Sequence, residues 1–260
     1  MNLGLSDRVV LVTGASKGIG YACAVAFAAE GARVAIASRS RANLDAALAR
    51  WPLTAKPLAV LADLVRAEEA TRLVDTVEAE LGPIDVLVNS AGAARRYLPE
   101  ELDAAAWHAA MDAKFFSYIH PLDVVVKRMA ARGRGAVVNV IGAGGKVANP
   151  VHLPGGAANA ALMLATTGLA AAYGPKGVRV NGINPGATLT GRVQEGLAVE
   201  ARLTGKSPDE LLARGQERLP LRRYGTPEEV ARVAVFLASD AASYVTGAIV
   251  PMDGGANAIV

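Results

Sequence analysis

A glycine-rich run, Thr13-Gly14-Ala15-Ser16-Lys17-Gly18-Ile19-Gly20, follows the first apolar stretch of the chain. Glycines let the backbone turn tightly and approach a pyrophosphate, and the N–H groups at the start of a helix bind negative charge. The run lies between an expected buried strand at 9–12 and an expected helix at 18–30. A glycine-rich turn alone also occurs in ordinary loops. In this position it predicts a dinucleotide site lined by Gly14, Ser16, Lys17, Gly18, Ile19 and Gly20.

The residues at the end of the second expected strand indicate which dinucleotide binds. A carboxylate at this point binds the adenosine ribose hydroxyls of NAD and repels a 2′-phosphate. This chain has Ser38 and Arg39 instead, and Lys17 stands in the first loop. Two cations and a hydroxyl suit the extra phosphate of NADP(H). We therefore predict NADP(H) in preference to NAD(H); the alternative is that Arg39 is only a solvated surface charge.

The elements that must position this site alternate along the whole chain. Apolar runs predict strands at 9–12, 34–37, 58–61, 84–88, 136–140, 178–181 and 248–250, and helical spacing predicts helices at 18–30, 41–50, 67–81, 101–131, 157–173 and 227–239. This pattern is typical of a Rossmann-type α/β fold, a doubly wound parallel sheet with helices on both faces. Ligands bind such sheets beyond the carboxyl ends of the strands. We expect one dinucleotide-binding domain at 1–260, with the polar stretch 190–219 forming a mobile segment that covers the substrate.

The composition indicates a single globular domain and argues against a nucleic-acid-binding protein. Of the 260 residues, 52% are hydrophobic and 20% are charged, and the formal net charge is +3. This is enough apolar material for one well-filled core. The basic residues are scattered, so we expect no nucleic-acid partner. We also predict no metal site.

Cellular location is predicted from what the sequence does and does not contain. We find no run of the roughly 18 apolar residues that a membrane span needs, and the first residues lack the features of a signal peptide. Cys23 is the single cysteine, and its alanine neighbours indicate a packed position on a helix. A lone thiol fits a reducing compartment. We therefore expect a cytoplasmic protein without membrane association.

Further motifs follow the first loop in order. They are Leu61-Ala62-Asp63-Leu64, Asn89-Ser90-Ala91-Gly92, Pro185-Gly186 with Thr190, Gly225-Thr226-Pro227-Glu228-Glu229-Val230 and Asp253-Gly254-Gly255. With them the chain resembles the short-chain dehydrogenase/reductase family nearly from end to end. The resemblance implies an oxidoreductase acting on a carbonyl or alcohol, a strand order of 3-2-1-4-5-6-7 and a homotetramer. It also implies cofactor contacts at Asp63, Leu64, Asn89, Ala91, Gly92, Pro185, Gly186, Thr188 and Thr190.

The family's catalytic set is where this sequence departs from the pattern. Members use an Asn-Ser-Tyr-Lys set, in which the Tyr gives or takes the proton. Matching the flanking residues puts Gly142 at the Ser position, Gly155 at the Tyr position and Asn159 at the Lys position. Lys114 stands at the Asn position. We therefore expect an atypical active site in which the usual mechanism does not operate.

Lys114, His152 and Asn159 are the candidates to replace that set. The resemblance places Lys114 and Asn159 close together, so that one cation and one amide persist with their positions exchanged. A partly buried lysine has a lowered pKa and could serve as the acid. His152, three residues before the vacant Tyr position, carries an imidazole that titrates near neutrality. The alternatives are a Lys114 that points to solvent or into a subunit contact, and a His152 that is only a surface or cap residue.

Two other features concern the substrate. Gly142, Gly144, Gly145, Gly155 and Gly156 are expected to line the cavity with almost no side-chain volume. That arrangement admits a bulky ligand, and relaxed selection would produce it as well. The segment Arg95-Arg96-Tyr97 is either a clamp for an anionic substrate or an exposed, solvated pair of arginines.

Three functions fit these observations. The favoured one is an NADP(H)-dependent oxidoreductase with a substitute acid and an unidentified small-molecule substrate, because hydride chemistry belongs mainly to the cofactor. The second is a non-redox lyase or hydrolase that keeps the cleft. The third is a catalytically silent dinucleotide-binding or regulatory subunit. Fold alone does not choose among them.

Overall fold

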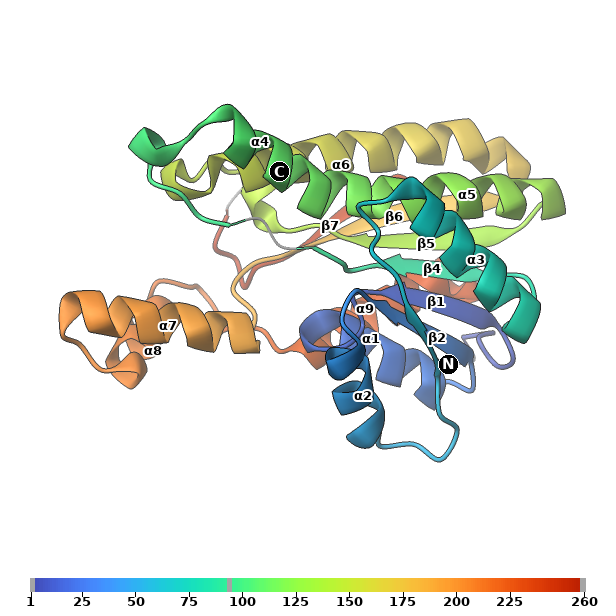
Figure 1. The fold of residues 1–260 in the computed structure, drawn as a ribbon, viewed down its shortest axis with the longest axis horizontal. Helices are drawn as coiled ribbons and strands as arrows, with labels where there is room; N and C mark the ends of the chain where they lie inside the picture. The colour runs from blue at the N-terminus through green and yellow to red at the C-terminus, as the bar shows by residue number, and fades with distance from the viewer. Residues whose placement is uncertain (1–2, 93–94, 258–260) are drawn as a thin grey trace.

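Seven parallel strands form one sheet in the order β3-β2-β1-β4-β5-β6-β7 (Figure 1). The structure is a computed structural model that describes residues 3–92 and 95–257, with the backbone alone at 192, 195, 199 and 203. The strands are β1 (Val9–Thr13), β2 (Arg33–Ser38), β3 (Leu58–Leu61), β4 (Val86–Asn89), β5 (Gly135–Val140), β6 (Val178–Pro185) and β7 (Ile249–Met252). The predicted fold class and strand order are confirmed.

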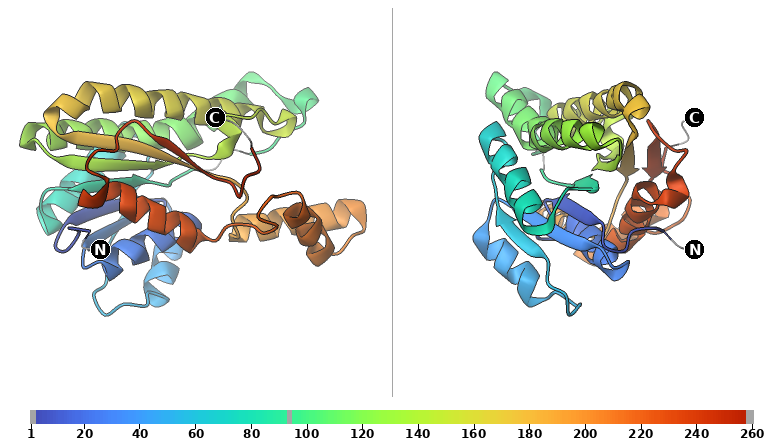
Figure 2. Two further views of the ribbon diagram at one scale, coloured as in Figure 1. Left: turned by 180° about the vertical axis from the view of Figure 1, so that it is seen from behind. Right: turned by 90° about the vertical axis from the view of Figure 1, so that its right-hand side faces the viewer.

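Helices cover both faces of this sheet (Figure 2). One layer contains α1 (Gly18–Ala29), α2 (Arg41–Ala49) and α9 (Pro227–Ala238), and the other contains α3 (Ala67–Leu81), α5 (Ser117–Arg132) and α6 (Leu153–Tyr173). Successive strand residues point to opposite faces, so each strand supplies both layers. In β1, Val10 and Val12 pack toward α1, whereas Val9 and Leu11 pack toward α3 and α5.

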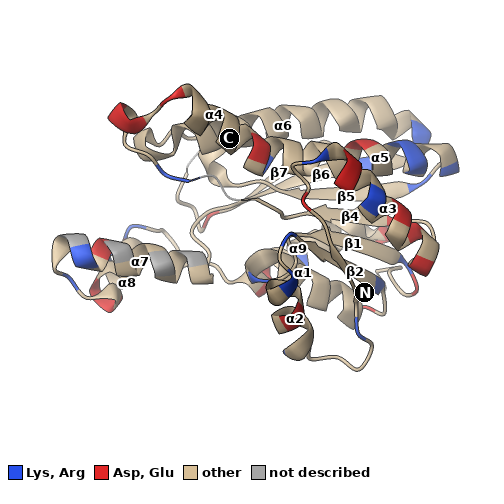
Figure 3. Cartoon of the chain, viewed as in Figure 1, with Lys and Arg blue, Asp and Glu red and all other residues tan. Residues whose placement is uncertain are grey.

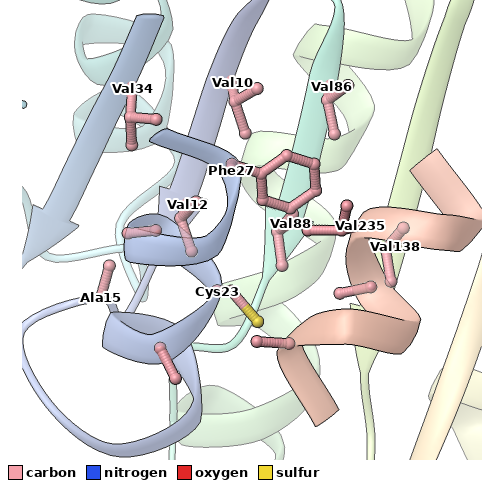
Figure 4. Packing of buried hydrophobic residues seen from close by; sticks show 14 of the residues in the cluster. Val10, Val12, Ala15, Cys23, Phe27, Val34, Val86, Val88, Val138 and Val235 are labelled. Carbon is pink, nitrogen blue, oxygen red and sulfur yellow. The ribbon is translucent and has the colours of Figure 1, made fainter. Parts of the chain in front are cut away.

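The core beneath α1 and α9 is made of small apolar side chains around one aromatic ring. Figure 4 shows Phe27 and Cys23 of α1 against Val10, Val88 and their neighbours on the sheet. Cys23 is wholly buried, which confirms the packed helix position expected for it. Burial raises the pKa of its thiol to about 12, because the thiolate would lose its hydration.

The helix predicted at 101–131 is helical from 104 to 132, but it begins later than predicted and contains a π-helical stretch. A 3-10 turn at Pro99–Glu101 precedes α4 (Ala104–Ala110), a π-helical stretch Met111–Phe116 and then α5. Pro121 lies inside α5 and lacks the N–H that a regular helix would donate to the carbonyl four residues earlier. The Ser117 hydroxyl donates to the Ala113 carbonyl over 2.9 Å, so one carbonyl of the widened turn gains a partner.

The stretch 190–219 contains two helices, α7 (Gly191–Thr204) and α8 (Pro208–Glu217). They pack on each other and project from the body at the end where the strands point (Figure 1). The two helices agree with the helical structure predicted for this stretch. Their covering of a substrate stays a prediction.

The segment Pro150–Lys176, which contains α6, is long and apolar enough by length and composition to cross a membrane, with a mean hydropathy of 1.2. This differs from the expectation that no such segment exists. The segment is rich in alanine, and Ala158, Leu162 and Ala170 are buried within the fold. A core helix passes the same test, so the finding is weak evidence for a membrane span.

Basic and acidic side chains are interspersed over α3 and α5 (Figure 3). Arg128 of α5 forms ion pairs with Asp75 and, over 2.7 Å, with Glu78, both on α3. Arg132 pairs with the same Glu78 over 3.3 Å. These charges therefore join two helices rather than form a stripe of one sign.

Candidate active site

The glycine-rich loop after β1 is shaped by close backbone contacts. Gly14 and Gly18 have φ of 63° and 59°, which side-chain-bearing residues rarely adopt. A Cβ on Gly14 would lie 2.6 Å from the Ala91 Cα, and one on Gly20 would lie 2.5 Å from the Gly14 carbonyl. The loops after β1 and β4 therefore touch, and α1 begins beside them with no acidic residue in its first turn. Its N-terminal N–H groups form a cradle that fits a pyrophosphate.

A chain of buried side chains fixes the strand ends below this cradle. Thr13 donates to the Asn89 Oδ1 over 3.3 Å, Asn89 donates to Asn139 over 3.0 Å and Asn139 donates to Thr166 over 2.9 Å. The Thr13 Oγ1 also accepts from the Ser90 N–H over 3.2 Å. Asn89 is fully buried, and its hydrogen bonds to Thr13 and Asn139 fix the end of β4 and the start of the loop that follows it.

Two exposed cations, Lys17 and Arg39, flank the start of α1 and the end of β2. Ser38 accepts from the Ser40 N–H over 3.4 Å, so its hydroxyl lies at the turn into α2. A third cation, Arg50, donates to the Ser16 carbonyl over 2.8 Å and stacks over the Tyr21 ring. Sequence reasoning missed Arg50, which braces the loop from the far end of α2.

Asp63 and Leu64 follow β3 at the same edge of the sheet. The Asp63 carboxylate accepts from the Val65 N–H over 3.3 Å, and Leu64 is buried. The Asp63 side chain therefore helps to fix the turn, and Asp63 is half-buried.

The segment from Pro185 to Thr190 returns to the first loop. A Cβ on Gly186 would lie 2.8 Å from the Asp253 Cβ, so only glycine fits against the strand end of β7. The buried Thr188 pairs with Gly225 in a short parallel bridge. The Thr190 methyl lies 3.6 Å from where a Gly18 Cβ would be. The segment from Pro185 to Thr190 thus lies beside the glycine-rich loop.

Lys114 lies at the carboxyl end of β5 rather than in solvent. Only 8% of the residue is exposed. Its ammonium donates to the Val140 carbonyl over 3.1 Å and to the Tyr118 hydroxyl over 2.8 Å. Gly92 has a φ of 92°, and a Cβ there would collide with the Ala113 carbonyl. The loop after β4 therefore lies directly against the π-helical turn that carries Lys114.

Asn159 of α6 and His152, just before α6, lie beside the loop that follows β5. The Asn159 Nδ2 lies 3.2 Å from where a Gly142 Cβ would be, and the His152 Cδ2 lies 3.4 Å from the position of a Gly144 Cβ. The Asn159 Oδ1 is buried and has no hydrogen-bond partner among the residues that the structure describes. A buried amide oxygen without a partner is costly and marks a place where a ligand hydroxyl can bind.

The glycines expected to line the cavity serve different purposes. A Cβ on Gly145 would lie 2.7 Å from the Ala160 nitrogen, and one on Gly156 would lie 2.8 Å from the Gly144 carbonyl. These two glycines let the loop after β5 pack onto α6, so for them the expectation of spare volume was wrong. Gly142 and Gly144 face the side chains of Asn159 and His152.

The loop with Arg95 and Arg96 is joined to the start of α6. The Tyr97 N–H donates to the Val151 carbonyl over 3.2 Å, which puts the loop next to His152. Both arginines are exposed, and the Arg95 guanidinium lies 5.7 Å from the centre of the Tyr97 ring. Their role as an anion clamp stays a prediction. Within residues 3–92 and 95–257, no group of three or more His, Cys, Asp or Glu side chains could hold a metal ion.

Comparisons with known proteins agree with this geometry. A family model described as enoyl-(acyl carrier protein) reductase matches residues 14–257. The chain therefore belongs to the short-chain dehydrogenase/reductase family.

Individual relatives match over almost their whole length. Galactitol 2-dehydrogenase (L-tagatose-forming) of Cereibacter sphaeroides is 38% identical over 96% of this chain and 95% of its own. Cis-4-hydroxycyclohexanecarboxylate dehydrogenase of Sinomonas cyclohexanicum is 36% identical over 100% of both chains. The solved structure of L-sorbose reductase from Gluconobacter frateurii, complexed with NADPH and L-sorbose, has a TM-score of 0.94 and 29% identity over 100% of both chains.

Proposed function

We propose that this protein is an NADP(H)-dependent oxidoreductase that acts on a carbonyl or alcohol group of a small molecule. Its family membership and the NADPH complex of a solved relative support the proposal. The cradle at the start of α1 fits a pyrophosphate, and Lys17 and Arg39 suit a 2′-phosphate. The site residues are those proposed from the sequence, in the loops after β1, β2, β3, β4 and β6.

The cofactor preference can be measured by direct binding. We expect NADPH to bind more tightly than NADH when each is titrated against the purified protein and followed by fluorescence. Equal or tighter binding of NADH would contradict the proposal.

We propose that Lys114 moves the proton in place of a tyrosine. A bound nicotinamide supplies or accepts the hydride, and the protein must then hold the substrate oxygen and transfer one proton. The observation that carries the proposal is the buried Lys114 ammonium fixed at the carboxyl end of β5. Gly142 and Gly155 offer no hydroxyl at their positions, which supports an atypical catalytic set.

Asn159 is proposed to orient the ligands of the same cleft. An amide carries both donors and an acceptor, so it can hold a carbonyl oxygen and a hydroxyl group. Its Nδ2 faces the space beside Gly142, and its Oδ1 is the buried atom without a described partner. His152, beside Gly144, is a second candidate for proton transfer.

Turnover is tested by NADPH oxidation against a panel of ketoses, cyclic ketones and acyl ketones, and by NADP reduction with the matching alcohols. We expect at least one substrate class to be turned over. If NADPH binds but no member of the panel reacts, a catalytically silent binding protein becomes the better account. Light scattering tests the proposed homotetramer, which would have four times the 26.7 kDa of one chain.

A further inference from the structure

A tyrosine that sequence reasoning did not select lies next to the Lys114 ammonium. The Tyr118 hydroxyl accepts from Lys114 over 2.8 Å and donates to the Val140 carbonyl. The ammonium also lies 4.4 Å from the centre of the Tyr118 ring. Tyr118 is wholly buried, so its hydroxyl lies behind Lys114 and does not line the cleft.

We propose that Tyr118 is a positioning residue that fixes the Lys114 ammonium for proton transfer at the carboxyl end of β5. A lysine side chain has many rotamers, and an acid must be held within hydrogen-bond reach of the reacting oxygen. The Tyr118 hydroxyl and the Val140 carbonyl are two fixed acceptors for the ammonium, and the Tyr118 ring makes a cation–π contact with it. The catalytic consequence rests on the proposed function, whereas the positioning does not.

The backbone brings these two side chains together. Residues four apart on a helix lie on one face, and Tyr118 follows Lys114 by four. Lys114 belongs to the π-helical turn and Tyr118 to the first turn of α5. Short π-helical stretches occur frequently at functional sites. This one lies against Gly92, at the wall of the proposed cofactor cleft.

The buried Lys114–Tyr118 pair costs folding free energy if it serves only to fill space in the core. An ammonium loses hydration when it is buried, and the groups that contact it here include a hydroxyl, a carbonyl and a ring face. An apolar side chain of similar size would fill the position without that cost. A buried cation beside a cofactor cleft is therefore better explained by chemistry than by stability.

The positioning can be tested without any turnover. The rate at which Lys114 is acetylated by an N-hydroxysuccinimide ester is followed by peptide mass spectrometry on the folded protein without cofactor. We expect Lys114 to react far more slowly than the exposed Lys176. Tyr118→Phe should speed the reaction of Lys114 by about threefold to tenfold, the equivalent of one hydrogen bond. Tyr173→Phe, which removes another tyrosine hydroxyl beside Lys176, is the control and should leave Lys114 unchanged.

The catalytic consequence is read from kinetics with a substrate found in the carbonyl panel. Tyr118→Phe should lower kcat about tenfold, leaving the NADPH Kd and the melting temperature close to those of the unaltered protein. Unchanged acetylation of Lys114 overturns the positioning, whether or not turnover is found. Faster acetylation with an unchanged kcat overturns the catalytic role. If Tyr118→Phe does not fold, Tyr118→Met removes the same hydroxyl and replaces it in both experiments.

Discussion

At the scale of single residues, Lys114 is buried at the carboxyl end of β5, and we propose that it stands where other family members have an asparagine. Its ammonium donates to the Tyr118 hydroxyl and to the Val140 carbonyl. Residues retained for chemistry commonly reduce stability, because the site they need is costly to fold. A Lys114 retained for chemistry should therefore matter for turnover and not for stability.

Replacement of Lys114 by methionine should not destabilise the protein. Methionine fills a similar volume and needs no hydration, and the Tyr118 hydroxyl still donates to the Val140 carbonyl. We expect a melting temperature equal to or above that of the unaltered protein, measured by circular dichroism. A fall of more than about 4 °C, the equivalent of roughly 1 kcal/mol or more, would instead assign Lys114 a structural role.

Replacement of Arg39 by aspartate should reverse the cofactor preference. The exposed guanidinium would be lost from the 2′-phosphate, and a carboxylate would be placed where NAD presents ribose hydroxyls. We expect NADPH affinity to fall about 10-fold to 100-fold, the equivalent of one charged hydrogen bond, while NADH affinity rises. Arg41→Asp, two residues further on, is the control. A preference that Arg39→Asp leaves unaltered would show that Arg39 is only a surface charge.

At the scale of elements, the start of α9 supports the segment around Thr188, which belongs to the proposed cofactor site. Thr226 and Glu229 cap the helix reciprocally, and Arg223 donates two hydrogen bonds to the Glu229 carboxylate. These contacts fix Gly225, which pairs with Thr188. The hydrogen bond from Arg223 and the one from the Thr226 backbone lower the pKa of Glu229 to about 2.

The lowered pKa of Glu229 predicts how a variant should respond to pH. A carboxylate whose pKa is lower in the folded state stabilises the protein above the unfolded pKa, and this contribution is lost as pH falls through the folded value. Glu229→Gln should therefore melt at a lower temperature than the unaltered protein at pH 7. The difference should shrink as the pH falls from about 4 toward 2, with Glu228→Gln as the control. A difference independent of pH would contradict this.

The elements themselves were largely predictable, and the exceptions have physical causes. β3 and α3 match their predicted ranges because apolar runs and amphipathic spacing are strong local signals. The π-helical stretch between α4 and α5 has only one weak signal in the sequence, Pro121, because the chain stays helical through it. The catalytic candidates were found through family motifs. Tyr118 was missed although its spacing from Lys114 was visible, because one aromatic residue on a helix is more often part of the core.

Long-range contacts explain what local reasoning missed elsewhere in the site. The close approach of Gly145 and Gly156 to neighbouring backbone depends on how α6 packs, which no local pattern shows. The same holds for Arg50, which braces Ser16 from a distant helix. Motifs predicted where the cleft lies, whereas these contacts depend on tertiary packing.

At the scale of the whole molecule, Cys23 reports on the integrity of the fold. Its thiol is wholly buried between α1 and the sheet (Figure 4). The pKa of about 12 means that this burial favours the neutral thiol, a contribution present below the unfolded pKa and lost as pH rises through about 12. We expect a disulfide reagent at pH 8 to react with Cys23 only as fast as the protein opens. Rapid reaction before denaturant is added would contradict the packing described for this layer.

The most direct test of the account is the effect of Lys114→Met on turnover and on cofactor binding together. With a substrate from the carbonyl panel, kcat/KM should fall by about 100-fold or more, the usual contribution of a positioned acid. The NADPH Kd should stay within about twofold, since we propose that Lys114 acts at the reacting end of the cleft rather than in the phosphate cradle. Turnover equal to that of the unaltered protein would show that Lys114 does not move the proton.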